Sequence, residues 1–455
     1  MNDSTVWREG DRDAHDEGTQ RPPAPPQRMP PPGTLSREVM PVEYAPHALS
    51  LLLTLVALGF MSPVGGLVTT MFTSMTFACW ISLRRGGAYF LPSSAFMLAS
   101  GVFIGAATFY LLQRDLSVSL AALRDAACLA MLSTIGTSAA TIAISNRWGL
   151  GWTTPPRAAT DPRRRFRSPK HFEVKALLLI GLSQVPVIKS TLGPIAVGAG
   201  LGGVLMITLS AASKQRRLRW YGDVLTVAIA FLVPVLWMEL FFVGGGRITL
   251  AGLAIASFVG WNLIRPRRAQ KALVILSIPV FLGFAGLNRA DDGTSTGSVV
   301  TKGDGLGSVY SPLQTWARIV EPKPDIESAK LGPRYGETFL HTLYLPIPRL
   351  IWENKPIGFG AELTPVLEPE LADTAHSMAA LTQGEWYANF GHAGLVLMIP
   401  VTGGFLALLD RTHYRLVQSQ LGTTSAWWAA VALLCVCASL GDLPWVGACT
   451  FFSRG

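Results

Sequence analysis

Runs of apolar residues long enough to cross a lipid bilayer recur along most of this 455-residue sequence. The mean hydropathy is +0.36 and only 15% of the residues are charged, which favours a membrane protein over several soluble domains. Because a transmembrane helix needs about 20 apolar residues, the pattern predicts an all-α polytopic protein with about eleven or twelve transmembrane helices. The predicted spans are 47–62, 65–83, 90–112, 126–145, 174–189, 193–213, 221–243, 248–264, 272–287, 391–409 and 424–440. A last apolar piece, 443–452, is too short for an ordinary span and predicts a partial or re-entrant helix.

Lysine and arginine residues are concentrated in alternate loops between the predicted spans. If the N-terminus is cytoplasmic, most of them fall in cytoplasmic loops, and the short external turns hold only Arg114, Arg124, Lys189 and Arg247. The positive-inside rule therefore predicts a multi-pass protein with a cytoplasmic N-terminus. The run RRRFR at 163–167 is predicted to bind anionic membrane lipids. This distribution explains the net charge of +9 without a nucleic-acid-binding face.

The spans divide the chain into a tail, a membrane region, one long loop and a closing membrane region. Residues 1–45 are a proline-rich cytoplasmic tail predicted to be disordered, and 46–287 hold roughly nine spans. Residues 288–390 form one external loop, and 391–455 hold the C-terminal spans. A loop of this length is usually functional. Its first half, including KGDGLG at 302–307, is rich in small residues, lacks the phosphate-loop pattern and predicts a flexible linker.

The predicted external position of this loop restricts its chemistry. ATP is absent there, so a reaction needs a substrate that is already activated, and a lipid-linked sugar diphosphate carries its own leaving group. Catalysis then needs cations that bind the diphosphate, and a base or strict positioning for the acceptor hydroxyl. No zinc motif is present, and the adjacent acids Asp291 and Asp292 are typical of a solvated linker. The sequence therefore predicts no metal and no cofactor.

Basic residues of the predicted outer face are candidates for the diphosphate site. Arg247 follows three glycines at the start of a predicted span, where a guanidinium can join free backbone N–H groups to bind an anion. The alternative for Arg247 is that its side chain only extends to place the guanidinium at the membrane–water interface. Lys189 lies at another external end, and Arg349 lies between Pro348 and an apolar pair. Arg334 and Lys355 begin and end the charged stretch RYGETFLHTLYLPIPRLIWENK.

Acid–base groups of the same face are candidates for proton transfer. The available groups are His341, His376, His392, Glu337 and Glu385. Of these, His341 and Glu385 are predicted to be catalytic. Glu239 is an acid within a predicted span, which indicates either a functional residue or the partner of a basic residue such as Arg247.

Three segments, in order and spacing, carry a resemblance to a known family. They are GGGRITLAGLAI at 244–255, LPIPRLIWENKPIGFG at 345–360 and GEWYANFGHAGLVLMIPV at 384–401. With the late external loop, they resemble the Wzy-type O-antigen and exopolysaccharide repeat-unit polymerases, and more distantly the O-antigen ligases. The resemblance covers roughly 47–452.

The resemblance implies a metal-independent glycosyltransferase of the C type in the plasma membrane. Such a protein transfers the growing glycan from undecaprenyl pyrophosphate to the next lipid-linked repeat unit at the outer face. It also implies pyrophosphate contacts for Arg247 and Arg349, and site roles for Lys355, Tyr387 and Asn389 besides Glu385. Partners implied are the lipid-linked oligosaccharide, a chain-length regulator and a flippase.

Two other functions remain open from the sequence. A ligase would use the same donor and a different acceptor. A transporter of polysaccharide or of lipid-linked sugars is a separate class, but transporters tend to show internal repeats, and no convincing repeat is present here. A metal-dependent glycosyltransferase is the least favoured, because the first external loop, at 62–66, has no acid.

Overall fold

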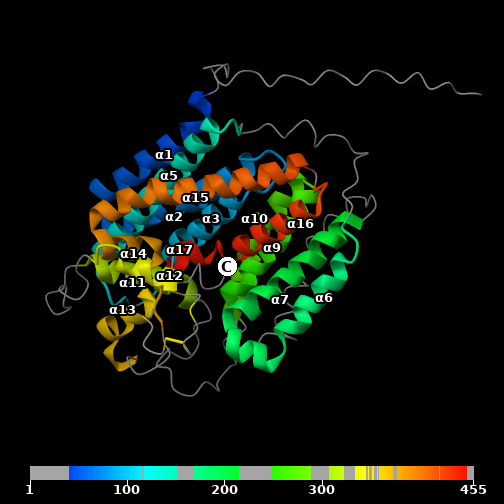
Figure 1. The fold of residues 1–455 in the computed structure, drawn as a ribbon. Coiled ribbons are helices and arrows are strands. Elements are labelled where there is room, and N and C mark those ends of the chain that lie inside the picture. The colour runs from blue at the N-terminus through cyan, green and yellow to red at the C-terminus, as the bar shows by residue number, and fades with distance from the viewer. Residues whose placement is uncertain are drawn as a thin grey trace, which may run out of the picture. The chain divides into compact units, whose positions relative to one another are not determined.

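The computed structural model describes residues 40–114, 116–150, 168–214, 247–287, 307–321, 334–344, 347, 351–352, 356, 358–371, 377–419 and 421–447. Within these ranges the regular elements are helices, and no strand is present (Figure 1). Five helices are long and apolar enough to cross a membrane: Pro63–Arg84, Pro92–Leu111, Leu120–Arg147, His392–Ser419 and Thr424–Val446. Shorter apolar helices cover Tyr44–Gly59, Gly198–Ser213 and Ala251–Ile264. The prediction of an all-helical membrane protein is confirmed at this level.

Part of the sequence-based interpretation concerns residues outside these ranges. They are the tail 1–39, the basic run 163–167, the predicted span 221–243, the linker 288–306, Glu239, Arg349, Lys355 and His376. For Lys189 and Arg247 the backbone is described and the side chain is not.

Helices α1 (Met40–Gly59), α2 (Pro63–Arg84), α5 (Leu120–Arg147) and α15 (His392–Ser419) pack along one another. Helix α1 begins earlier than the predicted span, inside the predicted tail. Helix α5 also begins earlier than predicted, because the Ser119 hydroxyl accepts a hydrogen bond at 3.1 Å from a backbone N–H of the first turn. Apolar periodicity alone does not reveal such a polar start.

The predicted span 90–112 is one continuous helical run that contains a π turn. It consists of α3 (Pro92–Gly101), η1 (Val102–Ala106) and α4 (Ala107–Leu111). Pro92 begins the run, where its fixed φ suits a first helical turn and its missing N–H leaves no bond unmade.

The chain breaks between α6 (Phe172–Ser183) and α7 (Pro186–Lys214) at a different place from the one predicted. The hydropathy pattern placed a turn after Lys189, but Lys189 lies inside the first turns of α7. Pro186 accounts for the difference, because proline is favoured at the start of a helix and disfavours helical backbone in the residue before it. The predicted boundary at 189 is therefore wrong.

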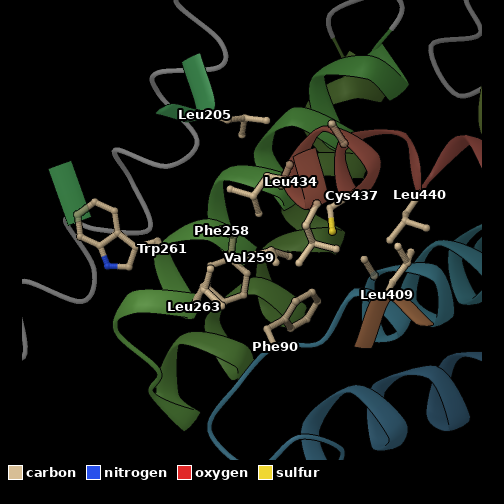
Figure 2. Close-up of a cluster of buried hydrophobic side chains, with 14 of the residues drawn as sticks. Phe90, Leu205, Phe258, Val259, Trp261, Leu263, Leu409, Leu434, Cys437 and Leu440 are labelled. Carbon is tan, nitrogen blue, oxygen red and sulfur yellow. The ribbon is translucent and has the colours of Figure 1, made fainter. Parts of the chain in front are cut away.

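Helices α7, α9 (Arg247–Ile264) and α16 (Thr424–Ser439) form the core shown in Figure 2. Leu434 and Cys437 of α16 face Phe258 of α9 there, and all three are buried. A Cβ at Gly252 would lie 1.9 Å from the Ala438 carbonyl oxygen, so only glycine allows these backbones to approach so closely. Small residues serve this purpose in membrane helices, where apolar lipid weakens the hydrophobic drive to associate.

A buried polar network joins the end of α2, the starts of α3 and α10 (Arg268–Leu287), and Asp410 within α15. Arg85 Nη2 lies 2.7 Å from Asp410 Oδ2, and both side chains are almost fully buried. The backbone N–H and hydroxyl of Ser93 donate to the same carboxylate at 3.0 and 2.7 Å. Lys271 Nζ donates to the Arg85 carbonyl at 2.7 Å. The basic residues Arg85 and Lys271, from two predicted cytoplasmic loops, therefore come together in this network.

We expect Asp410→Ala to lower the free energy of unfolding by about 3–5 kcal/mol, because it leaves the Arg85 guanidinium buried without its carboxylate. Thermal and denaturant unfolding in detergent, followed by tryptophan fluorescence, measures the change. The control is the neighbouring Arg411→Ala, which removes a stacking contact 4.8 Å above the Trp148 ring and should cost about 1 kcal/mol or less. Equal losses in the two variants would contradict the special role of the buried pair.

The remaining described helices come from the predicted external loop and from the segment after α16. They are α11 (Gly307–Val320), α12 (Glu337–Tyr344), α13 (Phe359–Leu367), the 3₁₀ turn η3 (Pro369–Leu371), α14 (Leu381–Phe390) and α17 (Asp442–Val446). Trp316 anchors α11 on α5, since its ring is fully buried and its Nε1 donates to the Ala126 carbonyl at 3.0 Å. The predicted loop is therefore partly helical and packs on the membrane helices.

Helix α15 separates the loop helices from the Arg85–Asp410 network. It begins at His392, directly after α14, and reaches Asp410 after about 27 Å at 1.5 Å per residue. This length is close to the roughly 30 Å of a bilayer's hydrocarbon core. The spacing between the polar cluster beside the start of α15 and the one at Asp410 therefore matches the thickness of a membrane.

Candidate functional site

The α12–α14 junction brings together two residues of the third motif and the charged stretch of the loop. Thr338 lies at its centre, on α12. Its hydroxyl donates to Glu385 Oε1 at 3.1 Å and accepts from Asn389 Nδ2 at 2.6 Å. Glu385 and Asn389 lie one turn apart on α14, so both face α12. All three side chains are fully buried.

Asn389 also holds the turn that enters α12. Its Oδ1 accepts from the Gly336 N–H at 3.1 Å, and its Nδ2 donates to the Glu385 carbonyl at 2.7 Å. The turn residues Tyr335 and Gly336 have positive φ values of 48° and 91°. A non-glycine residue in this region is strained, and such strain is often found at functional sites.

The backbone after α17 closes over the Glu385 carboxylate. Helix α17 contacts α14 (Figure 1), and Gly447 follows α17 directly in the sequence. A Cβ at Gly447 would lie 2.1 Å from Glu385 Oε2. Gly447 also has a φ of +103°, which favours glycine. Glu385 is thus enclosed between Thr338 on one side and the Gly447 backbone on the other.

A second carboxylate links the two predicted loop residues Arg334 and His341. This is Glu362 of α13, whose Oε2 is paired with Arg334 Nη1 and whose Oε1 lies 3.3 Å from His341 Nδ1. The three side chains are between 9% and 19% exposed, so the group is shielded but reachable from solvent. Close by, Arg318 of α11 pairs with Glu368 at 3.1 Å and so fixes the end of α13.

Tyr387 lies on another face of α14 from Glu385 and Asn389. Its ring stands edge-on to Trp316 at 5.3 Å and to His392 at 5.2 Å between ring centroids. In this structure Tyr387 therefore packs α14 against α11 and the start of α15.

Helix α9 begins at Arg247, as predicted, and α17 contacts both α9 and α14. Helix α17 thus lies between α9, which begins with Arg247, and the helix that carries Glu385. The side chains of Arg247 and Lys189, and the residues Arg349 and Lys355, lie outside what the structure describes. Their predicted roles stay predictions.

Two residues of this cluster were not predicted from the sequence: Thr338 and Glu362. Glu362 is the one acid in the short, otherwise mostly apolar segment FGAELTPVL, and that contrast was the available signal. Thr338 offered no such signal, because its role depends on its contact with α14.

Comparisons with known proteins add no relative. No family model, no curated protein and no solved structure matches this chain. Among the described residues, no group of three or more His, Cys, Asp or Glu side chains could hold a metal ion.

Proposed function

We propose that this protein is a polymerase of lipid-linked oligosaccharide repeat units. In this proposal it transfers a growing glycan from undecaprenyl pyrophosphate to the next lipid-linked unit. The observation that carries the proposal is the cluster at the α12–α14 junction, where Arg334, His341, Glu385 and Asn389 gather beside the start of α15. A cation, an imidazole and carboxylates at a membrane interface suit a reaction between a lipid diphosphate and a sugar hydroxyl.

The residues have separate roles in the proposed glycosyl transfer. The acceptor hydroxyl attacks the anomeric carbon of the donor, and the bond from that carbon to the pyrophosphate oxygen breaks. Arg247 and Arg349 stabilise the charge on the departing pyrophosphate. Glu385 is fully buried, so it acts by holding α12 and α14 together and thereby positions His341.

Reconstitution in liposomes with a purified lipid-linked repeat unit tests the proposal. A ladder of products that differ by one repeat unit is expected. A single transfer that occurs only with an added second acceptor would make the protein a ligase. No product with several donors, together with movement of the lipid-linked sugar between leaflets, would replace the enzyme by a transporter.

EDTA at millimolar concentration is expected to change the polymerisation rate by less than about twofold, because arginines supply the positive charge in this mechanism. The rate is measured before and after chelation, and again after Mg²⁺ is added back. A loss of more than about tenfold that Mg²⁺ restores would show metal catalysis and bring Asp291 and Asp292 back into consideration.

A further inference from the structure

Glu362 contacts two predicted site residues, the histidine His341 and the arginine Arg334. We propose that Glu362 positions His341 as the general base for the acceptor hydroxyl. The inference rests on the proposed function and deepens it, because it names the base. Neither residue lies in the three segments that carry the family resemblance.

The geometry around His341 supports the assignment. Its Nδ1 is buried and forms no aligned hydrogen bond, and the Glu362 oxygen lies 3.3 Å away. Catalytic hydrogen bonds are often long in the absence of substrate and tighten when it binds. A carboxylate at Nδ1 holds the proton on that nitrogen, so the lone pair is on Nε2, on the other side of the ring.

Arg334 completes the arrangement. It holds the second oxygen of Glu362, so the carboxylate cannot turn away from the imidazole. The backbone N–H of Arg334 in turn donates to the Ala388 carbonyl of α14 at 3.1 Å. Arg334 therefore ties the loop carboxylate to the helix that carries Glu385 and Asn389. This contact assigns Arg334 to holding Glu362 in the resting protein, in addition to its predicted contact with the substrate.

In the proposed reaction, proton transfer to His341 and glycosyl transfer to the acceptor occur in one step. The acceptor O–H bond breaks and its proton moves to His341 Nε2, while the oxygen forms a bond to the anomeric carbon. The electron pair of the broken glycosyl–phosphate bond leaves with the pyrophosphate. The resulting imidazolium faces Glu362, which stabilises the new charge, and its proton then passes to solvent.

Other ionisable groups near His341 serve as comparisons. Glu385, on α14, accepts its hydrogen bond from Thr338. Glu337 lies one turn before His341 on α12 and is exposed. Among the described residues, Glu362 is thus the acid that directly contacts the imidazole.

The test is a double-mutant cycle on reconstituted protein, with pyrophosphate-lipid release as the readout. We expect H341A to lower kcat by about 10²–10⁴-fold, and E362Q to lower it by about 10–100-fold with little change in the donor KM. If Glu362 acts through His341, E362Q added to H341A should cost less than about twofold more. E362D, which keeps a carboxylate, should retain more activity than E362Q. The control E337Q should stay within about twofold of wild type.

Other results would overturn the inference in distinct ways. Equal losses from E362Q in both backgrounds would show that Glu362 only supports the fold. Full activity of E362Q would show that His341 needs no partner. If E362Q does not fold, E362D takes its place in the cycle. An unchanged rate for H341A would by itself show that His341 is not the general base. A wild-type protein that makes no product refutes the proposed function instead.

Discussion

Polymer is expected to disappear from membranes that carry the Arg247→Ala protein, while the amount of folded protein stays unchanged. Helix α9 begins at Arg247, so its free backbone N–H groups and the guanidinium would bind the departing pyrophosphate together. Removing one such group from a transition-state site typically costs about 100–1,000-fold in rate. Product ladders from liposomes containing equal amounts of protein measure the loss.

The next helix in the chain, α10, offers a matched control for Arg247. Helix α10 also begins with an arginine, Arg268, which is exposed and lies in a predicted cytoplasmic loop. Arg268→Ala should leave the ladder within about twofold of wild type, because an exposed substitution away from the site changes little. Glycan products of normal length from the Arg247→Ala protein would show that Arg247 is not part of the site.

Gly447→Ala is expected to lower activity by about 100-fold, because the new methyl group would push on the Glu385 carboxylate. The Cβ would lie 2.1 Å from Oε2, and the φ of +103° is itself unfavourable for alanine. The Glu385–Thr338 hydrogen bond would have to shift, and a displacement of about 1 Å at a catalytic site can cost about 100-fold. The free energy of unfolding should fall by about 2–5 kcal/mol.

Gly441→Ala provides the comparison for this variant. Gly441 precedes α17 as Gly447 follows it, but its φ is −71° and a Cβ there would meet no atom within 4 Å. This variant should keep nearly wild-type activity and stability. A Gly447→Ala protein that is equally active would show that the enclosure of Glu385 is not needed for catalysis.

The local sequence predicts where the long helices of this protein lie, but it predicts less well where each helix begins and ends. Long apolar runs predicted α2, α15 and α16, because in a bilayer the backbone must satisfy its own hydrogen bonds. The start of α5 and the break before α7 depend instead on single polar or proline residues, Ser119 and Pro186.

The candidate site divides in the same way. Arg334, His341 and Glu385 were predicted because charged groups in the predicted external loop stand out against an apolar sequence, and Asn389 was predicted from the family resemblance. Their pairing was not predicted. The Glu385–Thr338 and His341–Glu362 contacts join residues far apart in the chain, and no periodicity encodes which of them meet.

The sequence by itself thus predicted that the chain is helical and spans a membrane, and it placed most of the candidate site residues in one late loop. Hydropathy acts within a few turns of the chain, so long apolar helices can be predicted without a fold. Only the tertiary structure decided that Thr338 joins α12 to α14, that Gly447 closes over Glu385, and that Glu362 holds His341 and Arg334. Those arrangements depend on how separate helices pack, because the helix surface that packs against a side chain determines which partner that side chain meets.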